Sequence, residues 1–196
     1  MYSIENNIEN TIIIKKSKFI CKIFRIQNEE EVILILNNLR NDYKDATHIC
    51  YSYICENKVK NNDDGEPAGT AGMPIYNVLK KNNLNMILCC VIRYFGGIKL
   101  GAGGLTRAYS NSVIEALKLA NIINLVDGYN IQIEFNYENT KNIDNILKNF
   151  NITNKIYDDN IKYIIEISTT NYNNIYNELK KYCIQININK KILVKN

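Results

Sequence analysis

The sequence lacks several patterns that mark common classes of protein. Its six cysteines include no CxxC pair and it has only one histidine, so the ligands of a zinc site are missing. No apolar run approaches the roughly 20 residues that span a bilayer, and no charged, apolar and small-residue leader precedes the first expected strand. We therefore expect no membrane span, metal or cofactor, and a cytoplasmic location in which reduced cysteines act as small hydrophobes.

Nucleotide-binding and calcium-binding motifs are missing as well. The glycine-rich stretch lacks the GxxxxGK[ST] spacing of a P-loop, and no acidic residue follows it at the distance of a dinucleotide fingerprint. The acidic segment does not match the ligand spacing of an EF-hand. ATPase and dehydrogenase chemistry are therefore not supported.

What is present indicates an ordinary folded protein of two small domains. The chain has 196 residues, of which 46% are apolar and 22% charged, enough to bury a core in each of two units. The 24 basic and 20 acidic side chains leave a net charge of +4, which permits an anionic partner without requiring one.

Glycine and proline are concentrated in one region. Eight of the nine glycines lie between Gly65 and Gly104, and both prolines, Pro67 and Pro74, lie there too. Glycine loses more conformational entropy on folding than other residues do, so it is costly wherever it lies. This concentration therefore indicates loops that need positive φ or the close approach of other groups.

The N-terminal part alternates strand and helix patterns. A helix is expected after Asn28, a capping residue followed by Glu29 to Glu31 in the first turn. A second helix has Pro74 in its first turn, and a third carries an apolar stripe made of Leu105, Tyr109, Val113, Ala116 and Ala120. Strands are expected at residues 11–15, 19–26, 48–55 and 86–92, and the last is apolar throughout, as a central buried strand is.

The C-terminal part reads as βαββαβ, the ferredoxin-like order. Its strands are expected near residues 131–137, 152–157, 161–168 and 184–193, and its helices at 139–150 and 171–182. Asp127 and Gly128 form a plausible turn before it. We therefore predict an α+β protein with domains at residues 1–127 and 128–196.

The strongest local motif is GGIKLGAGGLTRA, which runs into the third helix. Glycine-rich backbone that enters a helix leaves amides unpaired and directs the helix dipole at one point, which favours an anion. The predicted anion or nucleic-acid site consists of Arg93, Gly96, Gly97, Lys99, Gly101, Gly103, Gly104 and Arg107. In the alternative interpretation, the glycines only make a tight connection and the arginines pair with nearby carboxylates.

The acidic segment Asp63-Asp64-Gly65-Glu66-Pro67 has two interpretations. Its carboxylates could hold Mg²⁺ with water and a substrate phosphate, or act as acid and base. They could equally cap turns and neutralise the arginines. No metal is assigned.

Histidine and aromatic residues add weaker signals. His48 and Cys50 share a strand face, but positions i and i+2 lie roughly 6.5 to 7 Å apart along a strand, too far for a nucleophile and its base. A polar His48 that lines a cleft is the favoured interpretation. Tyr94, Phe95 and Tyr109 lie near the cationic residues and could stack nucleobases. Cys89 and Cys90 should point to opposite faces of the sheet and pack in the core.

Four strings together resemble the YigZ/IMPACT family: SKFI, THICYSY, DDGEPAGTAGMP and RYFGGIKLGAGGLTRAY. They span the N-terminal domain in order, while the tail is similar to the less distinctive C-terminal domain of bacterial members. Ile49 and Ser52 depart from the expected residues around His48.

The resemblance implies a fold for each domain and a role in translation. The first domain would look like the second domain of a small-subunit ribosomal protein, a fold also found in elongation factor G and GHMP kinases. The tail would look like a ferredoxin-like elongation-factor domain. Eukaryotic relatives regulate translation initiation under amino-acid stress through protein partners, and no agreed enzymatic activity comes with the family.

We therefore expect a regulatory protein that binds RNA, the ribosome or a translation factor through a glycine-rich basic cleft. The alternative is an enzyme for a small phosphorylated or otherwise anionic substrate, with His48, Asp63, Asp64 and Glu66 as acid, base or metal ligands.

Overall fold

The computed structural model describes residues 1–195, and the chain divides into two compact units between Ile123 and Asn124. Both units contain mixed α and β structure with antiparallel sheets. The predicted division at residue 127 lies four residues further along the chain. None of the helices described in residues 1–195 is long and apolar enough to cross a membrane.

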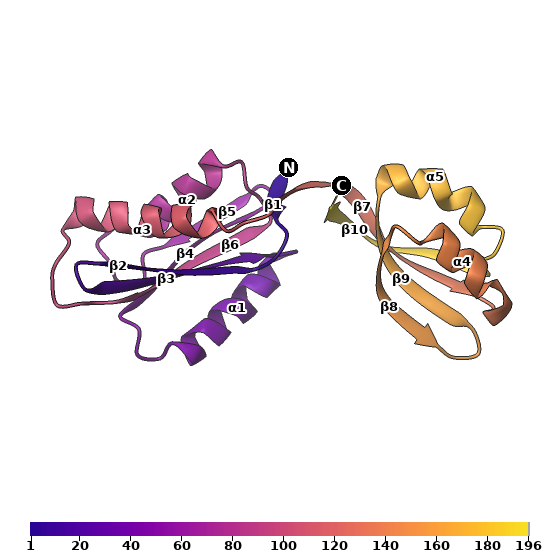
Figure 1. Ribbon diagram of the computed structural model, residues 1–196, viewed down its shortest axis with the longest axis horizontal. Helices are drawn as coiled ribbons and strands as arrows, with labels where there is room; N and C mark the ends of the chain where they lie inside the picture. Colours follow the sequence, from indigo (N-terminus) through magenta and orange to yellow (C-terminus); the bar gives the residue numbers. More distant parts are fainter. Residues whose placement is uncertain (196) are drawn as a thin grey trace. The chain divides into compact units, whose positions relative to one another are not determined.

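The first unit is built on an antiparallel sheet of five strands (Figure 1). In spatial order they are β2 (Ile8–Ile14), β3 (Ser17–Arg25), β6 (Ile87–Tyr94), β4 (His48–Cys55) and β5 (Lys58–Asn62). The centre of the sheet is β6, whose residues from Ile87 to Arg93 are all buried, as its apolar sequence predicts. His48 on β4 lies opposite Arg93 on β6.

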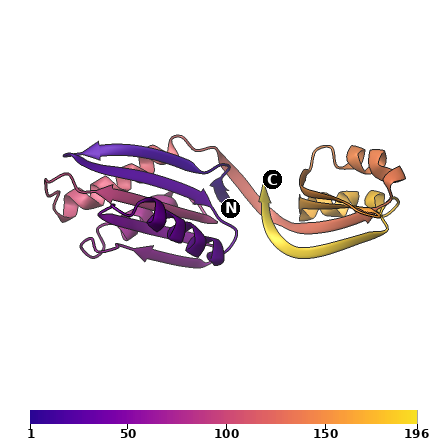
Figure 2. The ribbon, with the colours of Figure 1, turned by 90° about the horizontal axis from the view of Figure 1, so that it is seen from below.

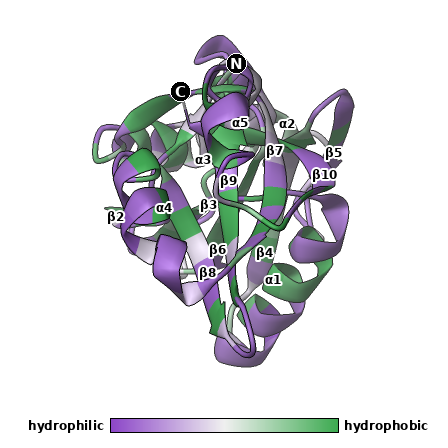
Figure 3. Ribbon diagram, turned by 90° about the vertical axis from the view of Figure 1, so that its right-hand side faces the viewer, coloured by the Kyte–Doolittle hydropathy of each residue, from purple (hydrophilic) through white to green (hydrophobic). Residues whose placement is uncertain are grey.

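Helices cover both faces of this sheet (Figures 1 and 2). One face carries α2 (Gly72–Lys81) and α3 (Ala102–Leu117), and the other carries α1 (Glu29–Asp42). The side chain of Asn28 accepts a hydrogen bond from the Glu31 amide at 3.0 Å, which confirms the predicted cap of α1. Figure 3 shows hydrophobic and hydrophilic residues along α1, which buries Val32, Leu36 and Leu39.

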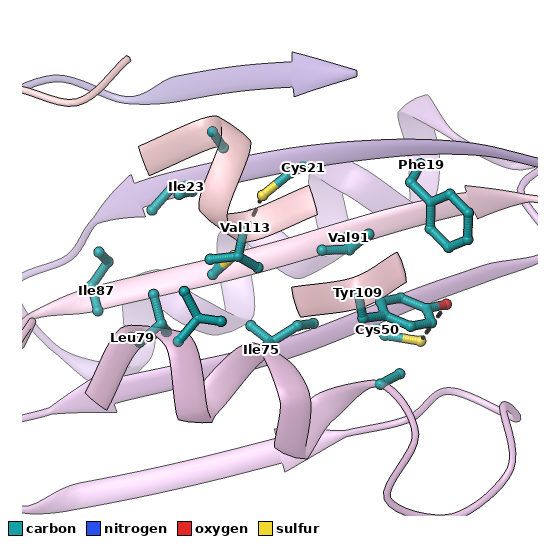
Figure 4. Packing of buried hydrophobic residues seen from close by; sticks show 14 of the residues in the cluster. Phe19, Cys21, Ile23, Cys50, Ile75, Leu79, Ile87, Val91, Tyr109 and Val113 are labelled. Carbon is teal, nitrogen blue, oxygen red and sulfur yellow. Dashed lines mark hydrogen bonds between the residues drawn. The ribbon is translucent and has the colours of Figure 1, made fainter. Parts of the chain in front are cut away.

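The main core of the first unit lies between the sheet and the pair α2 and α3 (Figure 4). Tyr109 and Val113 of α3 pack there with Ile75 and Leu79 of α2. The predicted stripe of α3 is buried from Leu105 to Ala116, but Ala120 lies beyond the end of the helix and is only partly buried. Cys89 belongs to this core, with its Sγ 3.6 Å from that of Cys21 on β3. Burial raises the pKa of the thiols of both Cys89 and Cys90.

The second unit has the predicted order of two helices and four strands. The elements are β7 (Ile122–Phe135), η1 (Tyr137–Asn139), α4 (Thr140–Ile146), β8 (Asn151–Tyr157), β9 (Ile161–Ser168), α5 (Thr169–Leu179) and β10 (Gln185–Lys195). The strands pair antiparallel in the order β10-β7-β9-β8. Tyr163 and its neighbours on one sheet face form the core with α4 and α5.

The predicted turn at Asp127 and Gly128 is wrong, because both residues lie within β7. Gly128 pairs with Ser168 on one side and Ile192 on the other. A Cβ at this position would lie 2.4 Å from the carbonyl oxygen of Ile167. Glycine therefore permits a close approach of neighbouring backbone here, which is a common reason for glycine within a strand.

Two strands of the first unit were not expected from the sequence. The strand β1 (Tyr2–Ile4) has only three residues, and β5 is a polar edge strand with the sequence KVKNN. Neither contains an apolar alternation long enough to predict a strand.

Candidate anion-binding loop and the buried polar network beneath it

The segment that joins β6 to α3 is held at its start by two hydroxyl groups. The amide of Phe95 donates to Thr47 Oγ1 at 3.0 Å, and the amide of Gly96 donates to Ser17 Oγ at 3.1 Å. These contacts fix where the glycine-rich loop leaves the sheet. Sequence reasoning assigned no role to Ser17 or Thr47, and the only signal for them was their place in the SKFI and THICYSY strings.

The loop ends at an α3 N-terminus that no side chain caps. Gly101, the N-cap residue, has φ +72°, and the first helical hydrogen bond runs from the Leu105 amide to the Gly101 carbonyl at 2.9 Å. The amides of residues 102 to 104 precede that bond, so they have no partner within the helix. Gly101 and Gly103 are exposed, with nothing within 4 Å of where a Cβ would lie.

Lys99 and Arg107 flank this helix start, and both are exposed. Neither forms an ion pair within residues 1–195. Gly97, with φ +85°, is also exposed and open, while Gly104 is half-buried against Leu100. Most of the predicted anion-binding residues are thus gathered in one exposed loop and the first turns of α3.

Arg93 differs from the other residues of that predicted site, because it is only 5% exposed. Its NH1 donates to Glu66 Oε1 at 2.5 Å. Its guanidinium carbon lies 5.4 Å from the ring centre of Phe19 and 5.6 Å from that of Phe95. For Arg93, the structure has the carboxylate-paired arrangement that the alternative interpretation requires.

Glu66 is the centre of a buried polar network. Its Oε1 also accepts a hydrogen bond from the hydroxyl of Tyr109 at 2.8 Å. Tyr109 is completely buried, so it cannot stack a nucleobase as the sequence suggested. Burial raises the pKa of the Tyr109 hydroxyl far above its usual value, so the hydroxyl stays protonated and donates to Glu66.

Cys50 is not arranged as a nucleophile (Figure 4). Its thiol lies 3.3 Å from the Tyr109 hydroxyl and 3.0 Å from the Asp63 carbonyl oxygen. Burial raises the pKa of Cys50 to about 12, so the reactive thiolate is scarce at neutral pH. The His48 ring contacts the Asp64 carbonyl and not Cys50. This agrees with the prediction that residues two positions apart on a strand are too distant to act as a nucleophile and its base.

The ring of His48 is oriented by the acidic loop. Its Nδ1 lies 2.7 Å from the carbonyl oxygen of Asp64, and that oxygen can only accept, so Nδ1 carries the proton. Its Nε2 lies 3.9 Å from Glu66 Oε2. The half-buried imidazole therefore directs Nε2 toward a buried carboxylate.

The two aspartates of the acidic loop cap backbone amides. The carboxylate of Asp63 accepts from the amides of Gly69, Ala71 and Gly72 at 2.8, 3.0 and 2.8 Å. Burial acts to raise the pKa of Asp63, but these three amides outweigh it and leave the pKa below the usual value. Asp64 Oδ2 accepts from the Ile49 amide at 2.6 Å. In residues 1–195, no group of three or more His, Cys, Asp or Glu residues is placed to hold a metal ion.

Several known proteins resemble this chain in sequence. The family model described as the Impact N-terminal domain matches residues 15–117. The IMPACT family member YvyE of Bacillus subtilis is 43% identical over 125 residues, and the match covers 62% of this chain and 58% of YvyE. YigZ of Escherichia coli is 37% identical over 110 residues, which is 54% of each protein. The chain therefore matches just over half the length of these relatives.

A solved structure resembles most of the chain, across both units. The crystal structure of a protein described only as hypothetical is 26% identical, has a TM-score of 0.64 and covers 92% of this chain and 91% of its own. The family match lies in the first unit, where the glycine-rich loop and the buried network also lie.

Proposed function

The chain belongs to the IMPACT family, and from this premise we propose that it is a translation-associated regulatory protein that binds RNA, free or within the ribosome. Binding takes place at the loop from Gly96 to Gly104 and the first turns of α3. The role in translation is supported by what the family resemblance implies. The choice of RNA is supported by the chemistry of the loop.

One observation carries the RNA proposal: the uncapped amides of α3 lie between two exposed cations, Lys99 and Arg107, that have no ion-pair partner in residues 1–195. Backbone amides at a helix start bind phosphate oxygens, and a guanidinium adds a bidentate contact. Phe95, which is 46% exposed, supplies an aromatic surface at the start of the same loop. Cations beside an exposed aromatic suit a single strand, whose phosphates and bases are both accessible.

Arg93 enters this proposal in a supporting role. Its guanidinium bonds to Glu66 and packs against Phe95, so it joins the acidic loop to the strand from which the glycine loop departs. Asp63 and Asp64 contribute in the same way, by capping the amides of the acidic loop and β4.

A second function is favoured by the geometry of His48 and Glu66. Because Nδ1 of His48 is bonded to a carbonyl, Nε2 is free to exchange a proton, and Glu66 Oε2 lies 3.9 Å away. An oriented imidazole beside a buried carboxylate is an acid–base pair, which an enzyme for a small anionic substrate would need. A metabolite that copurifies in place of RNA would favour this alternative.

We extend the proposal to the folds and the compartment. The strand order β10-β7-β9-β8 with two helices supports a ferredoxin-like second unit. The five-stranded antiparallel sheet supports the ribosomal-protein-like fold implied for the first. Six free cysteines suit the reducing cytoplasm, where translation takes place.

The proposal is tested by Arg107→Ala in the full chain. Binding to single-stranded RNA and to ribosomal particles should weaken similarly across sequences, and the salt slope for single-stranded RNA should fall by about 0.7, the value for one phosphate contact. The control is Lys141→Ala, which removes an exposed cation from the second unit and should change nothing. A wild-type protein that binds neither RNA nor ribosomal particles at low salt would refute the proposal.

A further inference from the structure

The turn between β2 and β3 has a backbone conformation that its two residues rarely adopt. Ile14 pairs with Ser17, so Lys15 and Lys16 form a two-residue turn. Both have positive φ, +44° and +66°. Such turns favour Asn-Gly because lysine is strained in this conformation. Two adjacent strained lysines suggest that their side chains, rather than the turn itself, are needed.

The turn is packed directly against the glycine-rich loop. A Cβ on Gly96 would lie 2.0 Å from the carbonyl carbon and 2.1 Å from the carbonyl oxygen of Lys16, so only glycine permits this contact. The amide of Gly96 also donates to Ser17 Oγ, directly after the turn. Figure 1 shows the turn and the loop that enters α3 at the same end of the sheet.

The turn therefore adds to the cations of the loop. Lys15 and Lys16 are exposed, and neither forms an ion pair within the part of the chain that is described. Lys18 follows on the same hairpin, with its Nζ 5.9 Å from the ring centre of Tyr94. The combined surface carries cations from a hairpin turn, a loop and a helix.

We propose that the Lys15–Lys16 turn is a second phosphate-binding element, which extends the α3 site into a track for the backbone of single-stranded RNA. This inference rests on the proposed function. Three separate segments with unpaired cations match a chain with one phosphate per nucleotide better than they match a single small anion. The exposed ring of Phe95 precedes Gly96, so it lies where a base between two bound phosphates could stack.

The test is the double variant K15N/K16G in the full chain. It removes both charges and installs the residues that this turn favours. The contact with Gly96 is made by the main chain of Lys16, so the turn should stay in place. We expect the thermal midpoint to rise by about 3 °C, because turn strain is relieved.

The same variant should lose affinity for a short oligouridylate. Removing two phosphate contacts should lower the salt slope by about 1.4, which corresponds to about 25-fold weaker binding at 0.1 M salt. The matched control is K80Q/K81Q, which removes two adjacent exposed lysines at the end of α2. This control should keep the wild-type affinity and slope.

The outcomes separate this inference from the proposed function. If R107A weakens RNA binding but K15N/K16G does not, the turn has no part in the site and the inference fails alone. If the wild type binds no RNA at low salt, both fail. If polyglutamate of equal charge binds the wild type as tightly as the RNA does, the surface recognises acidic protein and the RNA track is overturned.

Discussion

The carboxylate of Glu66 and the guanidinium of Arg93 form a buried ion pair, with NH1 and Oε1 2.5 Å apart and both side chains less than a tenth exposed. The pair joins the acidic loop to the central strand β6, and Tyr109 donates a further hydrogen bond to the same oxygen. Two distant glycine-rich motifs thus meet at one carboxylate.

Breaking this pair should strongly destabilise the first unit. Glu66→Gln leaves the guanidinium of Arg93 buried without a counter-charge, and such losses amount to about 3 to 5 kcal/mol. Denaturant unfolding should show this decrease. Lys118→Ala, which breaks the exposed pair with Glu115, should cost less than about 1 kcal/mol. A small effect of Glu66→Gln would mean that the pair is not buried in solution.

Asp63 should make stability depend on acid pH. Its pKa is lowered in the folded protein, so its contribution is fully present above the unfolded pKa, which is near 3.8, and is lost as pH falls through the lower folded pKa. Asp63→Asn should remove part of this acid dependence and cost about 1 to 3 kcal/mol at neutral pH, because its amide offers a single accepting oxygen. Urea unfolding at a series of pH values measures both effects. The control is Asp42→Asn at an exposed position, which should change neither the acid dependence of stability nor the stability at neutral pH.

Three glycine variants should separate close contact from backbone conformation. Gly96→Ala should be the most damaging, since its Cβ would meet the Lys16 main chain. Gly97→Ala has open space but φ +85°, so it should cost about 1 kcal/mol. Gly103 has open space around it and no positive φ, and it lies in α3. Gly103→Ala should therefore stabilise the protein by up to about 1 kcal/mol. Thermal unfolding tests this order, and an undamaged Gly96→Ala protein would contradict the described packing.

Cys50 should be unreactive in the folded protein. Its raised pKa, about 12, means that alkylation by iodoacetamide at mildly alkaline pH should be far slower than in the urea-unfolded chain. Mass spectrometry of the labelled peptides measures this difference. Rapid labelling of native Cys50 would restore the case for a nucleophilic cysteine.

The first unit should keep anion binding by itself. A chain that ends at residue 127 retains the whole glycine loop, the hairpin turn and the buried network. Its RNA affinity should match that of the full chain. Loss of binding in a truncated protein that circular dichroism shows to be folded would mean that the second unit completes the site.

Much of the secondary structure followed from sequence alone, since it depends on local chemistry. The strand from His48 to Cys55 follows from a mostly apolar run, the Asn28 cap from a capping side chain and the buried stripe of α3 from apolar periodicity. The glycine-rich motif likewise predicted a free helix start, because a glycine N-cap offers no side chain to cap it.

Tertiary structure decided which polar groups are partnered and which are free. Arg93 and Arg107 belong to one sequence motif, but strand pairing buries Arg93 beside Glu66 while Arg107 stays exposed on α3. Sequence likewise cannot distinguish a turn glycine from one in a crowded strand, so Gly128 was misassigned. The Lys16 contact with Gly96 joins residues 80 positions apart, and only the packed chain shows why a side chain is excluded there.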